Sequence, residues 1–418
     1  MPRAIFFFAA VLMATITSIP DGGTSYALDY RINGAFFDGI YSHARYWDPD
    51  TNGFDRNETY HVADLYTGIT APVSPRMNLY LAGDLVWYHS WRPDSEDDIK
   101  ADLSNASLNL NDENIKINLG YQLFSFGKSL VFYDSAPGAH LSWNGPARFY
   151  ADLSAARVMG RSSIASITLG ARPGFLEDTA IFFIRMHDAN DGFARMVDPG
   201  YLLLPLENTG NLYWYGMKWD IFVGDLFVSG IVMGQSGSLD LKYDTLSSTV
   251  QVEAFAGDLK CTYPVSDTVS TGVFLFCASG DSRPLSGKVR AFVSPRPYNN
   301  SSIIFFNGGL DAQDITDRFS FAGIRWPGVI APGITYTWQP KTNLAAELSA
   351  LVLYPEDAPA GRSWYGWETD LRMTWDINEK FSLFANMAMF RHGDMFETID
   401  GTRPDPIYAG NTGINLFF

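Results

Sequence analysis

The fold is decided by the stretch Ile407-Tyr-Ala-Gly-Asn-Thr-Gly-Ile-Asn-Leu-Phe-Phe418. Every second residue falls on one face, and the residues between them are mostly small or polar, which is the period-two pattern of a β-strand with one apolar face. That face must be covered either by a protein core or by lipid. A sheet in lipid must also close on itself, because no strand edge can face hydrocarbon. The rest of the sequence distinguishes these two environments.

The N-terminus has the features of a secretory signal peptide. Arg3 supplies a positive charge, residues 4–16 form an apolar core, and Ser25-Tyr26-Ala27 offers a small-x-small cleavage pattern. We therefore expect residues 1–27 to be removed and residues 28–418 to form the mature protein. The mature part has no uncharged apolar run long enough for a membrane-spanning helix, so any span must consist of strands.

The composition favours a membrane sheet over a nucleic-acid-binding protein. Aromatic residues make up 15% of the chain, Gly occurs 37 times, and charged residues are only 18%, below the roughly 25% typical of soluble domains. The net charge of −16 argues against nucleic acid as a partner. Cys261 and Cys277 are the only cysteines, and the sequence leaves open whether they form a disulfide.

Short and long connections alternate along the chain. The predicted short turns lie at 72–76, 111–114, 224–225, 264–268, 340–343 and 378–380, and the long loops at about 42–59, 92–102, 128–147, 189–211, 281–317, 355–363 and 392–406. Outer-membrane barrels show this asymmetry, with short periplasmic turns and longer extracellular loops.

The strands between these connections predict an all-β protein, a transmembrane antiparallel up-and-down β-barrel of about 16–18 strands, with an aqueous channel. The predicted strands are 28–41, 60–71, 76–91, 103–111, 115–127, 148–157, 179–188, 212–223, 226–236, 248–263, 268–279, 329–339, 344–354, 364–376, 380–391 and 407–418. Segment 163–171 is a further strand that does not fit the alternation of up and down strands. It needs a second additional strand, for which 318–326 is a candidate, and the total would then be 18. A final strand that ends on an aromatic residue is typical of such barrels.

The two faces of residues 365–375 differ in chemistry. One face carries Tyr365, Trp367, Leu371 and Met373, and the other carries three charged residues. Because charges cannot face lipid, the second face is predicted to line a polar lumen. Leu383 is also expected to face lipid. The lumen candidates from this and other strands are Asp29, Arg31, Lys116, Gln122, Arg185, Lys218, Asp220, Glu368, Asp370 and Arg372.

Several motifs resemble those of the alginate-export family of outer-membrane channels, in the same order along the chain. They are Leu119-Gly-Tyr-Gln-Leu-Phe-Ser-Phe-Gly127, Ala278-Ser-Gly-Asp281, Tyr365-Gly-Trp-Glu-Thr-Asp370, Asp376-Ile-Asn-Glu-Lys-Phe-Ser-Leu383 and Phe390-Arg-His-Gly-Asp394. The resemblance implies a β-barrel pore in the bacterial outer membrane, a sugar polymer or other anionic substrate, and no catalysis. Tyr121 stands where the family has Arg, which leaves a porin for another solute as an alternative.

A basic segment is the predicted selectivity element. Residues 282–310 contain Arg283, Lys288, Arg290 and Arg296 and no acidic residue, and Arg318 and Arg325 are possible extensions. If this loop folds into or over the lumen, it will attract anionic solutes. If it lies outside, its cations will pair with acidic neighbours or with lipid phosphates.

The stretch from Asp48 to Glu58 resembles a calcium loop. Asp48, Asp50 and Asn52 stand at positions 1, 3 and 5 of the pattern, with Asp55 and Glu58 as further oxygen donors. It would hold a structural Ca²⁺ in an extracellular loop, and no other cofactor is expected. An ordinary Asx-rich surface loop is the alternative.

Catalytic motifs are absent from the sequence. The six histidines show no ligand spacing, and neither Gly-x-Ser-x-Gly nor His-Glu-x-x-His occurs. A barrel enzyme acting at the rim and a secreted glycan-binding β-protein stay as weaker alternatives. The expected partners are outer-membrane lipid and a polar or anionic solute or polysaccharide, and the sequence identifies no periplasmic partner.

Overall fold

The computed structural model describes most of the chain, and the statements below refer to that part. It comprises residues 31–48, 53–91, 97–158, 162–173, 176–189, 207–243, 246–281, 288–294, 302–306, 327–358, 361–397 and 401–418. The predicted signal peptide, residues 1–27, lies outside these ranges. No helix among the described residues is long and apolar enough to cross a membrane.

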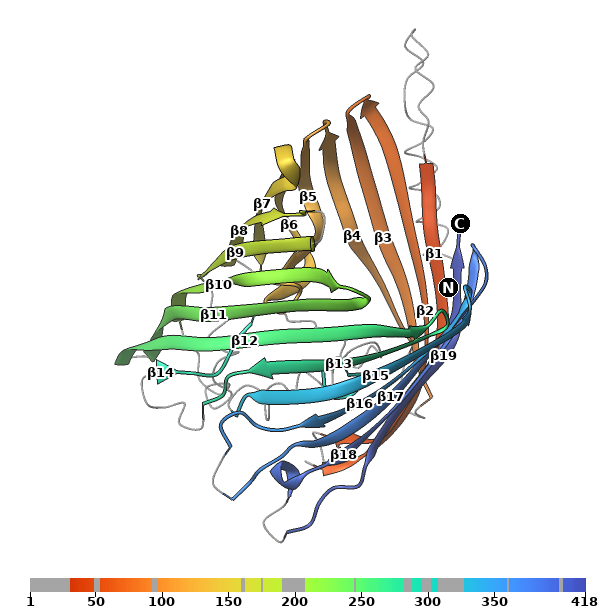
Figure 1. The fold of residues 1–418 in the computed structure, drawn as a ribbon, viewed down its shortest axis with the longest axis vertical. Helices are drawn as coiled ribbons and strands as arrows, with labels where there is room; N and C mark the ends of the chain where they lie inside the picture. Colours follow the sequence, from red (N-terminus) through yellow and green to blue (C-terminus); the bar gives the residue numbers. More distant parts are fainter. Residues whose placement is uncertain are drawn as a thin grey trace.

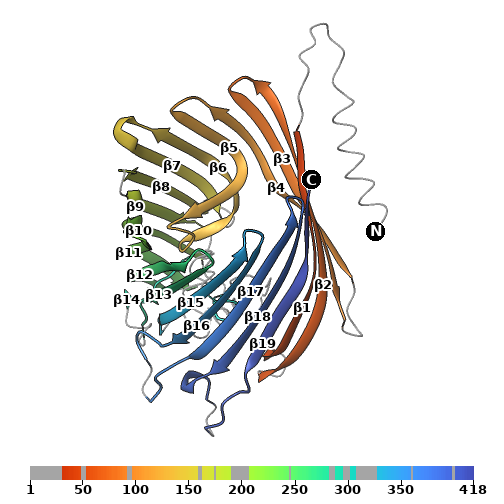
Figure 2. The same ribbon diagram turned by 45° about the vertical axis from the view of Figure 1, so that its right-hand side comes forward.

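The described residues form one closed antiparallel sheet, because β1 pairs with both β2 and β19. Figures 1 and 2 show the strands following one another around the ring. The strands are β1 (Arg31–Asp48), β2 (Gly53–Ser74), β3 (Met77–Ser90), β4 (Asp98–Asn111), β5 (Ile115–Phe126), β6 (Phe132–Asn144), β7 (Phe149–Val158), β8 (Ser162–Ala171), β9 (Leu176–Asp188), β10 (Glu207–Val223), β11 (Leu226–Tyr243), β12 (Leu246–Ser266), β13 (Val269–Ala278), β14 (Lys288–Val289), β15 (Val329–Lys341), β16 (Leu344–Leu353), β17 (Gly366–Asn378), β18 (Phe381–His392) and β19 (Ile407–Phe417), with short 3₁₀ turns η1 (Pro146–Arg148) and η4 (Asp394–Phe396).

The wall of the barrel consists of eighteen strands. β14 is not one of them, because it lies in the connection between β13 and β15 and pairs in parallel with the upper part of β12. The predicted all-β transmembrane barrel is therefore confirmed at the upper end of its strand count. The prediction of a loop at 128–147 is wrong, because most of that stretch is β6. β6 is also the extra strand that was needed to fit segment 163–171 into the alternation of up and down strands. Residues 318–326 lie outside the described ranges.

The two ends of the barrel differ as predicted. One end carries short turns, at 75–76, 112–114, 145–148, 224–225, 267–268, 342–343 and 379–380. The longer connections, such as those between β9 and β10, β13 and β15, and β18 and β19, all lie at the other end, together with some short ones such as that between β5 and β6. By the general arrangement of outer-membrane barrels, the short-turn end faces the periplasm. Some loops are shorter than predicted. The connection predicted at 42–59 reduces to 49–52, because β1 and β2 continue as a paired hairpin to Asp48 and Gly53.

The outer face of the wall is apolar. Ile181, Ile334 and Met387 are each about 60% exposed, as expected of side chains that face lipid. The prediction for Tyr365 is wrong: this residue is fully buried inside the barrel, and its hydroxyl donates to the Gly328 carbonyl at 2.8 Å. The alternation breaks at Gly366, whose φ of 143° lies in a region that suits glycine and changes the direction of the chain just before β17.

Candidate functional site: a constricted lumen

A hairpin leaves the wall and enters the barrel. β5 pairs with β4 only as far as Tyr121, and β6 pairs with β7 only from Gly138 onward. Residues 122–137 therefore pair with each other but with neither neighbouring strand, and Figure 2 shows this part of β5 and β6 curving into the interior. We call residues 122–137 the inward hairpin.

The tip of the inward hairpin is a strained turn held by one lysine. Gly127, Lys128 and Ser129 have φ values of 61°, 49° and 70°, and the latter two are unfavourable for residues with a side chain. Lys128 Nζ lies 2.9 Å from Asp220 Oδ1 on β10 and 2.9 Å from Ser229 Oγ on β11. These contacts fix the tip against a wall that is several strands away in the ring.

A second insertion comes from the connection between β13 and β15. Gln235 on β11 holds the backbone of Val293 with both ends of its amide, at 3.0 Å to the N–H and 2.9 Å to the carbonyl. The Trp214 indole also donates to that carbonyl, at 3.3 Å. Ser294 Oγ donates to the Val131 carbonyl at the tip of the inward hairpin, at 3.1 Å. Segment 288–294 thus crosses the inner face of β10–β12 and meets the hairpin.

A third insertion, segment 302–306, is held by a buried carboxylate. Glu368 on β17 accepts the backbone N–H groups of Ile303, Ile304 and Phe305 at 2.8, 2.7 and 2.9 Å. Asp370, two residues along the same inner face, accepts the N–H of Ile303 at 3.3 Å. Both carboxylates are fully buried. They therefore line the lumen as predicted, although their direct role is to anchor a loop.

The interior is less polar than predicted. The inward positions of β8–β13 are mainly apolar in their upper halves, and they pack against the insertions in one cluster with the hairpin residues Phe124, Phe126 and Phe132. Apolar residues occur on both faces of these strands, on the outward face in the lower rows, such as Ile167, Phe183 and Tyr215, and on the inward face where the insertions pack. Alternation alone could not identify this half-filled lumen.

The lower part of the lumen carries charges of both signs. Lys218 lies 3.2 Å from Asp178, and Arg372 lies 3.3 Å from Glu347. Lys116 is exposed on the same inner face of β5 as Gln122, which is buried and donates to the Asn118 carbonyl at 3.3 Å. These predicted lumen residues do face inward. Arg185 does not, because it alternates with buried Ile184 and Met186 and so projects outward.

The described part of the predicted basic segment gives a mixed result. Lys288 forms an ion pair with Glu253 on β12, which is one of the pairings expected of a loop that lies outside the lumen. Arg290 is exposed, while its backbone N–H donates to Asp281 Oδ2 at 3.0 Å. Arg283, Arg296, Arg318 and Arg325 lie outside the described residues, so their role stays a prediction.

The predicted calcium loop lies at the end of the β1–β2 hairpin. Asp48 ends β1, whereas Asp55 and Glu58 belong to β2, so these residues are part of paired strands rather than of one open loop. Asp50 and Asn52 lie outside the described residues. No group of three or more potential metal-ligating side chains occurs in the part of the chain that the structure describes. Calcium binding stays a prediction.

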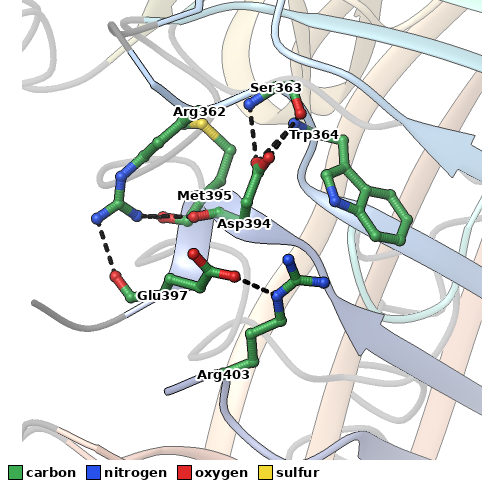
Figure 3. Close-up of polar contacts among 7 residues, drawn as sticks. All are labelled: Arg362, Ser363, Trp364, Asp394, Met395, Glu397 and Arg403. Atoms are coloured by element: carbon green, nitrogen blue, oxygen red, sulfur yellow. Dashed lines mark hydrogen bonds and ion pairs between the residues drawn. The ribbon is translucent and has the colours of Figure 1, made fainter. Parts of the chain in front are cut away.

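The rim at the long-loop end is held by a network that the sequence did not reveal. The Arg362 guanidinium donates to the carbonyls of Asp394, Met395 and Glu397. In return, the Asp394 carboxylate accepts the N–H groups of Ser363 and Trp364, both at 2.8 Å (Figure 3). Partial burial opposes ionisation, but these hydrogen bonds outweigh it and hold the pKa of Asp394 below its ordinary value. We call this network the rim clasp.

The fold has well-defined structural neighbours. No protein-family model matches the sequence, and no curated protein matches it. Among solved structures, Pseudomonas aeruginosa OccK5 (OpdH) superposes with a TM-score of 0.58 at 8% identity, over 93% of this chain and 98% of that chain. Acinetobacter baumannii OccAB4 gives 0.57 at 11% identity, over 93% and 98% of the two chains. P. aeruginosa OpdK, crystallised with vanillate, gives 0.56 at 10% identity with the same coverage.

At this level of identity the neighbours establish the fold. They are whole-chain matches to eighteen-strand outer-membrane barrels, and the expected outer-membrane location agrees with them and with the apolar outer face. They support an outer-membrane channel fold without specifying alginate export.

Proposed function

We propose that this protein is a non-enzymatic outer-membrane channel for small polar solutes. The observation that carries the proposal is that three insertions enter a closed barrel and are hydrogen-bonded to its inner wall through Lys128, Gln235 and Glu368. Such anchoring fixes the width of the passage instead of leaving it to loop motion. A fixed constriction favours small solutes, and this favours a porin over a polymer exporter.

The distribution of charge in the lumen supports a polar solute that carries a carboxylate or many hydroxyls. Asp64, Asp84 and Asp102 line the inner face of β2–β4, whereas Lys218 and Lys260 lie on β10 and β12. In the ring order β3 and β12 are nine strands apart, so the acidic strip faces, across the lumen, a strip in which Lys218 and Lys260 alternate with Asp178, Asp220 and Asp258. Charges of both signs at a constriction can orient polar solutes as well as anionic ones.

The proposal is tested by solute flux through purified protein in liposomes. A small sugar, the aromatic carboxylate vanillate and an alginate oligomer are compared as solutes. We expect vanillate and the sugar to enter, and the Lys218→Ser/Lys260→Ser double variant to slow vanillate more than the sugar. Arg391→Ser is the matched control, because Arg391 is exposed on the outer side of β18. Permeation of the alginate oligomer alone would instead support polymer export.

As evidence for the kind of solute, the resemblance to alginate exporters is weaker than the constriction. Glu368 and Asp370 belong to one of the motifs that suggested the family, and both anchor segment 302–306. The motif is thus accounted for by a structural role. For a barrel enzyme, the described residues offer a contact of 2.7 Å between His140 Nδ1 and Ser154 Oγ on the inner faces of β6 and β7. His392, the buried histidine of β18, packs against Phe390 and Phe396.

A further inference from the structure

The outer surface of β7–β10 changes from apolar to basic in three registered rows. The lowest row consists of paired apolar residues, in the order Leu153, Ile167, Phe183 and Tyr215. The middle row is Ala155, Ala165, Arg185 and Tyr213, and the top row is Arg157, Ser163, His187 and Asn211. Within each row, every residue lies directly opposite the next one on the neighbouring strand, so the four residues are near neighbours on one face.

The outward direction of these rows is set by strict alternation. Arg157, Arg185 and His187 are exposed, whereas the residues between them, such as Val158, Ile184 and Met186, are at most 3% exposed and pack in the interior. None of the described outward positions in the three rows is acidic, although the whole chain carries a net charge of −16. This is a local reversal of charge on the outside of the barrel, at the upper edge of the apolar band.

We propose that this basic patch, formed by Arg157, Arg185, His187 and Asn211, binds a phosphate group of a lipid in the outer leaflet. The apolar row beneath it would contact the acyl chains, while the patch lies at the depth of the headgroup. A soluble anion would gain nothing from Leu153, Ile167 and Phe183, which are all exposed. The combination of cations above and aliphatic or aromatic residues below fits an amphiphile with a phosphorylated headgroup, of which lipid A is the outer-leaflet example.

Local hydrogen bonds orient the donors of the patch. Asn211 Oδ1 lies 3.2 Å from an Arg185 guanidinium nitrogen and 3.3 Å from His187 Nδ1. One contact uses only part of the guanidinium, which has five N–H donors in a fixed fork. Arg185 can therefore donate to a phosphate while Asn211 holds its side chain in place, and the Nε2 edge of His187 is directed away from Asn211.

The test is lipid retention by the intact barrel. Purified protein is equilibrated in detergent with bisphosphorylated lipid A or with its dephosphorylated form, and bound lipid is counted by native mass spectrometry. We expect wild-type protein to retain the bisphosphorylated form. The Arg157→Ser/Arg185→Ser double variant should retain it about tenfold less for each charge-assisted hydrogen bond lost. Arg391→Ser, which removes an exposed outward cation on β18, should behave as wild type.

Two outcomes would overturn the assignment. Equal retention of the dephosphorylated lipid would show that acyl contacts alone bind, and displacement of lipid A by inorganic phosphate at millimolar concentration would assign the patch to small anions. Heat-modifiable migration checks that each variant is folded. A second double variant, Arg157→Lys/Arg185→Lys, keeps the charge and should retain most of the binding, which separates a phosphate site from a purely structural role.

Discussion

Lys128, at the tip of the inward hairpin, lies 2.9 Å from Asp220 on β10, so one ion pair joins an element that has left the wall to a distant part of that wall. Both side chains are less than 30% exposed. Lys128→Met should release the tip and increase single-channel conductance in planar bilayers. In a double-mutant cycle with Asp220→Asn we expect a coupling of about 1 kcal/mol. Additive effects of the two changes would show that apolar packing alone holds the hairpin.

Glu368 should control the position of segment 302–306. Glu368→Ala leaves the buried N–H groups of Ile304 and Phe305 without an acceptor, each at a cost of roughly 1–3 kcal/mol, while the Ile303 N–H keeps only its 3.3 Å hydrogen bond to Asp370. The segment should therefore leave its site and the conductance should rise. The matched control is Asp376→Asn, an exposed inward carboxylate near the other end of the same strand. If both variants conduct like the wild type, segment 302–306 is not part of the constriction.

Gln235 offers an independent test of the second insertion. Gln235→Leu removes both hydrogen bonds to Val293 and leaves a branched apolar side chain in the same place. We expect faster hydrogen exchange at Val293 and a larger pore for neutral sugars in a liposome-swelling assay. Gln235→Glu retains the acceptor for the Val293 N–H and should have a smaller effect. Unchanged exchange at Val293 in the Leu variant would contradict this role.

The lipid-facing assignment of β17 predicts an asymmetric response to arginine. Leu371 is half-buried and lies on the outward face with exposed Met373 and Trp375. Leu371→Arg should therefore lower the free energy of unfolding in bilayers by about 2–4 kcal/mol. Thr374→Arg, on the exposed inward face of the same strand, should be tolerated. The opposite order, measured by denaturant titration in vesicles, would reverse the two faces.

The rim clasp should loosen on acidification. Because the folded-state pKa of Asp394 is lowered, its contribution to stability is present above the ordinary aspartate value of about 3.9 and is lost as the pH falls through the lower folded value. Hydrogen exchange at Ser363 and Trp364, corrected for intrinsic rates, should accelerate only in strongly acidic buffer. Asp394→Asn should show the faster exchange already at neutral pH, and protection that is the same in both proteins would exclude this carboxylate as the anchor.

The sequence predicted the wall well, because lipid on one side imposes a strict alternation of apolar and other residues. Residues 367–375 and 115–121 were assigned to the correct faces for this reason. The prediction from the sequence failed where one side of the strand does not face lipid. β6 was missed because its upper half lies inside the barrel, and Tyr365 was placed in lipid because Gly366 changes the chain direction. The anchoring roles of Gln235 and Glu368 depend on backbone groups more than 50 residues away, which no local pattern reports.

Because the inward hairpin leaves the wall, the neighbouring strand β4 lacks a partner along part of its length. The upper part of β4, residues 98–105, pairs with β3 on one side and has no strand partner on the other among the described residues. An open edge of this kind is a template for pairing with another chain. Asp98, Lys100 and Asp102 are all exposed along it, on the inner face of the barrel. Because charged side chains on an edge strand disfavour pairing with another chain, we expect this edge to resist edge-to-edge aggregation during assembly.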